Sequence, residues 1–283
     1  MKKTLTSIVS LSVLVSASSA ANFYGVTAAN NLIRFTDTNF AAPSSSVGIT
    51  GLVASDGVTP DAFAQILNLG YSDTGTLYGL DSNANFYSLN GSSGAATLLG
   101  NTFAPFGFDL GFAYDPFSFG FRVVSDSAEN YLIGTDGSVS MGSDTFYGAF
   151  DANEFAATVF TALGIDPIFG EAFAIDPDLD VLAQTFDPNF EEFFTVGDLG
   201  VDITGYTSLT IDEDGVLFAA LSEDGLTSAL FTIDSGTGLA TEVGDFGLGI
   251  NALTAVPEPS AYAAIFGLFS IGMAAFRRRR SAS

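Results

Sequence analysis

The chain of 283 residues contains no cysteine, no histidine and no tryptophan. Without cysteine it can form no disulfide, thiolate nucleophile or cysteine metal site. Without histidine it lacks the usual general base and the commonest transition-metal ligand, which excludes Ser-His-Asp catalysis and histidine-based zinc sites. The sequence also shows no phosphate-binding loop, dinucleotide fingerprint or nucleophile elbow. Enzyme classes that depend on these groups are therefore excluded.

Positive charge is equally scarce. Eight Lys and Arg residues face 32 Asp and Glu residues, and six of the eight lie near the chain ends. Between residues 21 and 256, two Arg face 31 carboxylates, so this part has a net charge near −29. Such a surface repels phosphate backbones and argues against nucleic acid as a partner. It serves solubility, or it binds a divalent cation such as calcium (Ca), which prefers carboxylate ligands.

Short apolar runs bounded by Gly, Asn, Asp and Ser recur along the chain in steps of 44 to 54 residues. Five anchor runs define this repeat, at 23–26, 77–80, 121–124, 172–175 and 217–220. A second run follows each anchor, at 32–35, 86–89, 130–133, 179–183 and 230–233. A further run precedes four of them, at 65–71, 109–114, 155–160 and 206–211. Runs this short and so regularly punctuated predict strands of an antiparallel meander.

The first anchor has no preceding run, but an unpaired run lies at the other end, at 250–256. A last strand that joins the first sheet would close a ring and leave no open edge. Four short strands with a period of 40 to 50 residues are the signature of a β-propeller. The predicted fold is all-β: a single propeller of about five four-stranded blades closed by the N- and C-terminal strands. The alternative is an open β-sandwich with coincidental repetition.

Two segments depart from the regular repeat. Residues 103–121 contain eight aromatic side chains, which form a stacking platform for sugars or, as we expect, fill the space between blades. Residues 142–170 show no strict period, and we expect their loops on one face of the disc.

The two ends of the chain predict export. Residues 1–21 resemble a signal peptide for the Sec translocon, with Lys2 and Lys3, an apolar run and a small-residue cleavage site. The propeller domain is expected to span residues 22–256. The tail, residues 257–283, contains a run of sixteen apolar or small residues, 261–276, marginal in length for a membrane helix.

The tail resembles the PEP-CTERM sorting signal in three elements that occur in order at the C-terminus. They are the motif Val256, Pro257, Glu258, Pro259 and Ser260, the apolar run, and the cluster Arg277, Arg278, Arg279 and Arg280. The arginines are expected to stay cytoplasmic, with the propeller outside. The resemblance implies that an exosortase-type enzyme in the inner membrane cleaves the tail, and that the protein is released or attached at the surface of a cell that makes exopolysaccharide. The alternative is a plain membrane anchor.

The body, from Phe23 to Val256, is similar to a family of secreted bacterial repeat domains known only as a domain of unknown function. The similarity is carried by 23–26, 107–109, 115–116 and above all by Arg122 to Asp126 with Asn130. It implies a propeller-like fold and no activity. Arg122, one of two basic residues in the mature domain, could hold an anionic sugar in a central funnel or satisfy carboxylates in a buried network, and we favour the network.

Two acidic turns are the candidate metal sites. Asp176, Asp178 and Asp180 are spaced like the start of a calcium loop, but the glycine and glutamate of an EF-hand are replaced by Val181 and Asp187. A looser calcium site remains possible there and at Asp212 and Asp214. The alternative that we favour is that these residues cap β-turns.

Three functions are compatible with these features. The first, which we favour, is a non-enzymatic surface or extracellular-matrix protein. The second is a calcium-assisted glycan-binding module. The third is a carboxylate-dependent glycosidase or lyase, since two nearby carboxylates suffice for that chemistry.

Overall fold

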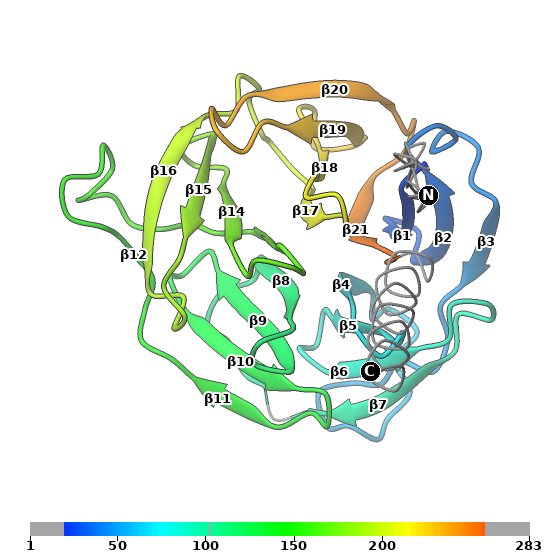
Figure 1. Ribbon diagram of the computed structural model, residues 1–283. Helices are drawn as coiled ribbons and strands as arrows, with labels where there is room; N and C mark the ends of the chain where they lie inside the picture. Colours follow the sequence, from blue (N-terminus) through cyan, green and yellow to red (C-terminus); the bar gives the residue numbers. More distant parts are fainter. Residues whose placement is uncertain (1–19, 102, 258–283) are drawn as a thin grey trace, which may run out of the picture.

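The computed structural model describes residues 20–101 and 103–257, which form five sheets around a central axis (Figure 1). Blade 1 contains β21 (Ile250–Ala255), β1 (Asn22–Thr27), β2 (Asn31–Thr36) and β3 (Ser45–Gly48). Blade 2 contains β4 (Ile66–Tyr71), β5 (Leu77–Asp81), β6 (Phe86–Leu89) and β7 (Ala96–Gly100). Blade 3 contains β8 (Leu110–Asp115), β9 (Gly120–Ser125), β10 (Asn130–Gly134) and β11 (Val139–Met141).

Blade 4 contains β13 (Ala162–Ile165), β14 (Ala172–Asp176), β15 (Val181–Thr185), β16 (Glu192–Asp198) and the added strand β12 (Phe146–Tyr147). Blade 5 contains β17 (Thr207–Ile211), β18 (Leu217–Leu221), β19 (Ala229–Ile233) and β20 (Ala240–Asp245). In each blade the first strand named is the innermost one. In blade 4 the added strand β12 is the outermost one. This is the five-bladed β-propeller that the repeat predicts.

Burial explains why the anchor runs are the most apolar part of each repeat. The anchor strands β5, β14 and β18 are buried at every position, because both of their faces pack against neighbouring blades. The outer strand β20 is instead mostly exposed and carries polar residues. The buried anchor strands are therefore more apolar than the exposed outer strand β20.

The ring closes as the sequence predicts. β21 pairs antiparallel with β1, with Phe23 opposite Ala255 and Gly25 opposite Leu253, so the last strand of the chain completes the first blade. The backbone N–H of Val256 donates to the carbonyl of Asn22 at 2.8 Å, which holds the two ends of the domain together. The unpaired run at 250–256 is thereby confirmed as the closing strand.

Aromatic rings fill the space between blades 2 and 3. Phe112 and Phe121 stack with ring centroids 4.7 Å apart, and both pack in one core cluster with Tyr78 and Phe86. The expectation that all eight aromatics of residues 103–121 lie between blades is only partly correct. Four of them lie in turns with exposed side chains: Phe106, Phe108, Phe117 and Phe119.

Blade 4 differs from the prediction in two ways. Its innermost strand is β13, whereas the expected run 155–160 forms no strand, because the Val159 N–H is bound by the side chain of Asp176. The insertion at 142–170 does not lie on one face of the disc. Its strand β12 pairs in parallel with β16 and extends the outer rim (Figure 1).

The predicted signal peptide, apart from its last residues, and nearly all of the predicted sorting tail lie outside the described residues. Within residues 20–101 and 103–257, no helix is long and apolar enough to cross a membrane.

Candidate functional site

The innermost strands β21, β4, β8, β13 and β17 surround a central channel with two mouths. The residues near their C-terminal ends line one mouth, and the residues near their N-terminal ends line the other. We call these the narrow mouth and the wide mouth, because their cavity volumes are about 90 Å³ and about 560 Å³.

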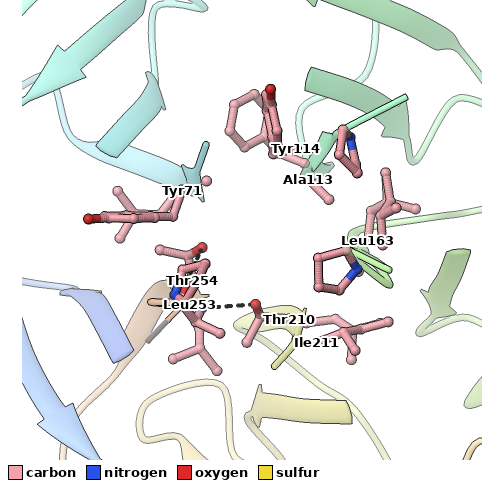
Figure 2. Close-up of a pocket in the computed structure, with 18 of the residues that line it drawn as sticks. Tyr71, Ala113, Tyr114, Leu163, Thr210, Ile211, Leu253 and Thr254 are labelled. Carbon is pink, nitrogen blue, oxygen red and sulfur yellow. Dashed lines mark hydrogen bonds between the residues drawn. The ribbon is translucent and has the colours of Figure 1, made fainter. Parts of the chain in front are cut away.

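The narrow mouth is lined by residues near the C-terminal ends of the innermost strands. Tyr71, Tyr114, Leu163 and Leu253 surround it, each from a different innermost strand (Figure 2). Thr210 Oγ1 accepts a hydrogen bond from the Ala255 N–H at 2.9 Å, which ties β17 to the closing strand β21. A volume of about 90 Å³ holds only a few water molecules, at ~30 Å³ each. With about 90 Å³ against about 560 Å³, this mouth offers less space for a ligand than the wide mouth.

The wide mouth is polar and has unused hydrogen-bonding groups. Its lining includes Asn68, Asp109, Thr161, Asp178 and Asn251, which come from four of the five blades or their connections. Asn251 is only 8% exposed, yet among the described residues its Nδ2 has no partner, and neither has Thr161 Oγ1. Because buried polar atoms are nearly always hydrogen-bonded, these two atoms mark places for water or a ligand.

The loop at residues 106–109 is held rigidly beside this mouth. Asp126 accepts the N–H groups of Phe108 at 3.1 Å and Asp109 at 3.4 Å, and Glu129 accepts those of Phe106 and Gly107 at 2.9 Å each. This arrangement places the exposed Phe108 ring at the rim of the cavity. The loop therefore offers a fixed aromatic surface next to carboxylates and amides.

Burial and hydrogen bonds shift the pKa values of two carboxyl groups around this loop in opposite directions. The pKa of Asp109 is raised, first by burial and then by the nearby charge of Asp126. Burial also acts to raise the pKa of Glu129, but hydrogen bonds from Tyr131, Gly107, Phe106 and Ser125 outweigh it and hold the pKa below its ordinary value. Glu129 is therefore an anionic anchor for the loop, while Asp109 is the mouth carboxyl that takes up a proton more readily.

The three residues of the family motif lie apart from one another. Asp126 holds the loop at the wide mouth, whereas Arg122 and Asn130 bind the turn between β15 and β16 in the next blade. Arg122 pairs with Asp115 at 3.2 Å, donates to the Pro188 carbonyl at 2.7 Å and lies over the Phe190 ring. Asn130 donates to the Asn189 and Phe190 carbonyls. Arg122 thus lies in the largely buried network that we favoured, where it holds blades 3 and 4 together.

The candidate metal residues mainly support turns, and the two acidic turns lie at opposite mouths. Asp176 accepts hydrogen bonds from the backbone of Asp178 and Leu179, and Asp180 accepts one from Ile203. Asp212 caps its own turn through the N–H groups of Asp214 and Val216. In the described part of the chain, no three acidic side chains lie close enough to hold a metal ion. Calcium binding stays a prediction.

Asn68, Thr161 and Asn251 were not predicted as site residues, and Asp109 was predicted only as part of a family motif. A usable signal exists for three of these four residues. Asn68, Asp109 and Asn251 are polar residues among the first four positions of the innermost runs 65–71, 109–114 and 250–256, although Gln65 is another and does not line the cavity. Since all five innermost strands begin at the same mouth, polar residues at those starts must converge. Thr161 gave no such signal, because the run before it was misplaced.

Buried carboxyl groups paired with tyrosines predict an unusual pH dependence. Asp81 is buried and accepts hydrogen bonds from Tyr87 and Asn85, yet burial raises its pKa above the ordinary value near 3.8. Above the folded-state pKa, burial of the charged carboxylate lowers the free energy of unfolding by its full cost. This cost vanishes as the pH falls below the ordinary pKa, because the carboxyl group is then neutral in both states. We therefore expect the wild type to gain stability relative to Asp81→Asn between pH 7 and pH 4. Urea unfolding of both proteins measures this difference, and a loss instead of a gain would contradict it.

The fold is a five-bladed β-propeller, and the larger of the cavities at its two mouths lies at the wide mouth. The chain belongs to the family of the domain of unknown function DUF4394, whose model matches residues 31–256. The PEP-CTERM protein-sorting motif matches residues 255–281. Proteins with this motif are exported, processed by exosortase and sorted to the cell surface.

A solved structure supports the fold. A crystal structure of a nidogen/laminin complex contains a chain that is similar with a TM-score of 0.51 and 10% identity, covering 84% of this chain and 98% of that one. A protein of unknown function from Bacteroides thetaiotaomicron is similar with a TM-score of 0.47 and 18% identity, covering 71% of this chain and 54% of that one. At 10% identity the likeness to the chain in the nidogen/laminin complex shows the fold alone. No curated protein shows a significant match to this chain.

Proposed function

We propose that this exported protein is a non-enzymatic cell-surface or matrix protein that binds an uncharged glycan at the wide mouth of the propeller. The observation that carries the proposal is the cavity of about 560 Å³ in which Asn251 Nδ2 and Thr161 Oγ1 lie without partners. A sugar hydroxyl both donates and accepts hydrogen bonds, so it can satisfy an amide nitrogen and a threonine hydroxyl together. The site thus fits a polyhydroxylated ligand.

The aromatic rim supports the same ligand class. Phe108 is exposed at the cavity edge, and its loop is fixed by Asp126 and Glu129. An exposed but rigid ring suits the apolar face of a sugar, because little conformational entropy is lost on binding.

Charge favours an uncharged glycan over an acidic one. Asp109 and Asp178 lie in the mouth, and the domain as a whole has a net charge near −29. This field repels polyanions at low and moderate ionic strength. A neutral polysaccharide meets no such barrier, and carboxylates are good acceptors for its hydroxyl groups.

Co-sedimentation of the full exported protein with the producing cell's exopolysaccharide tests the proposal. We expect the wild type to pellet, Phe108→Ser to bind about tenfold more weakly, and Phe63→Ser to bind like the wild type. Phe63 is the matched control because its ring is also exposed but does not line the cavity. Equal binding by both variants would contradict the assignment of the site.

The same assay separates the competing functions. We expect binding to persist in chelator, because the candidate calcium carboxylates are engaged in turns. Loss of pelleting in chelator would favour a calcium-assisted module. Release of reducing ends or unsaturated sugars from the polysaccharide would instead indicate a carboxylate-dependent glycosidase or lyase.

A further inference from the structure

We propose that the face around the narrow mouth rests on the membrane surface while the sorting tail is still attached. The proposal is independent of any ligand at the wide mouth. It rests on two apolar turns at this face, on the point where the chain leaves the propeller, and on the apolar run predicted as the membrane segment of the tail.

Two turns of similar sequence, 115–119 and 166–170, point their carboxylates inward and their apolar side chains outward. Asp115 accepts the Phe117 N–H at 2.9 Å, and Asp166 accepts the Ile168 and Phe169 N–H groups at 2.7 Å. The carboxylates are thereby engaged by the backbone of their own turns. The exposed fractions of the outward side chains are 64% for Phe117, 70% for Phe119, 55% for Ile168 and 79% for Phe169.

These four side chains lie in two adjoining turns, and we call them together the apolar ledge. Pro116 and Pro167, which precede them in the two turns, both line the narrow mouth. The two turns are in direct contact, because the Phe117 ring of one packs against Gly170 of the other. Any side chain at position 170 would place its Cβ atom only 2.7 Å from this ring. The ledge therefore joins blades 3 and 4 on the narrow-mouth face.

The chain leaves the propeller at the same face. Pro257 lines the narrow mouth, and Val256 is hydrogen-bonded to Asn22. The apolar run of the tail begins at Ala261, four residues after Pro257. Four residues span at most about 14 Å even when fully extended. A bilayer entered at Ala261 must therefore lie close to the narrow mouth.

Lipid is the occupant that this geometry favours. The ledge is apolar, one of its two capping carboxylates is paired with Arg122, and exposed phenylalanines gain free energy by entering the interfacial region of a bilayer. The exposed ring of Phe63 lies in the connection to β4, which begins at the wide mouth. In the attached precursor the wide mouth consequently faces away from the membrane.

The absence of native cysteine makes single-cysteine probes a clean test. We would reconstitute the full chain, with its tail, into phosphatidylcholine vesicles and label Phe119→Cys, Phe169→Cys and the control Phe63→Cys with a polarity-sensitive fluorophore. We expect blue-shifted emission from the two ledge probes and at least twofold stronger quenching by lipids with a nitroxide near the headgroup. The control should emit as in water.

Three outcomes would overturn the proposal. Equal quenching of ledge and control probes would leave the narrow-mouth face in water. Blue-shifted emission without quenching by nitroxide lipid would assign the ledge to a protein partner or a second copy. If the labelled chain failed to float with the vesicles, the narrow-mouth face would not be bound to the membrane at all.

Discussion

Replacing Asp176 with alanine is expected to lower the free energy of unfolding by about 3 kcal/mol. The side chain is 0% exposed and accepts hydrogen bonds from Tyr147 Oη at 2.9 Å, the Val159 N–H at 3.1 Å and two N–H groups of its own turn. Alanine leaves these donors without their acceptor. The loss is partly offset, because burial raises the pKa of Asp176 and the charged form no longer has to be desolvated.

Urea unfolding followed by circular dichroism measures this change. Asp178→Ala is the matched control, since Asp178 lies two residues away in the same turn and is exposed. The control should stay within about 0.5 kcal/mol of the wild type. If Asp176→Ala lowered the free energy of unfolding by less than the control, Asp176 would not be the residue that holds the 158–160 segment against blade 4. If added calcium stabilised the wild type but not the variant, the metal interpretation of this turn would gain support.

Replacing Leu253 with aspartate should abolish cooperative folding or cost more than about 4 kcal/mol. Leu253 is buried in the core cluster that contains Phe23, Phe35 and Phe218, and it lies opposite Gly25 in the closing pair of strands. A charge at this position has no partner. It would detach β21 from β1 and leave the innermost edge of blade 1 unpaired.

The matched control is Val243→Asp on the outer strand β20, which is exposed and already lies beside Glu242. It should change stability by less than about 0.5 kcal/mol. A closed ring predicts that Leu253→Asp lowers hydrogen-exchange protection in all five blades. Loss of protection in blade 1 alone would show that the blades are stable independently of closure.

The repeat was predictable because local chemistry determines it. The anchors are apolar because β5, β14 and β18 are buried on both faces, and the turns between runs require Asp, Asn and Gly. Closure was predictable because the first anchor has no preceding run and one unpaired run, 250–256, remains at the other end. The repeat depends on residues that are neighbours in sequence, and closure follows from the count of its runs.

What could not be predicted depends on contacts between distant residues. The run 155–160 has the composition of a strand, but Asp176 takes the Val159 N–H, and pairing with β14 starts only at Ala162. The parallel pairing of β12 with β16 joins residues more than 40 positions apart. The wide mouth requires five strand starts to meet at one point, which only the closed ring provides.

The closing strand also determines how the attached protein would carry mechanical load. β21 runs toward the narrow mouth and ends beside Asn22, so a pull on the tail acts along the strand axis. Its five residue pairs with β1 would then be loaded together in shear, rather than broken one at a time by peeling. If the protein stays attached through its C-terminus, the innermost strand of the ring is also its tether.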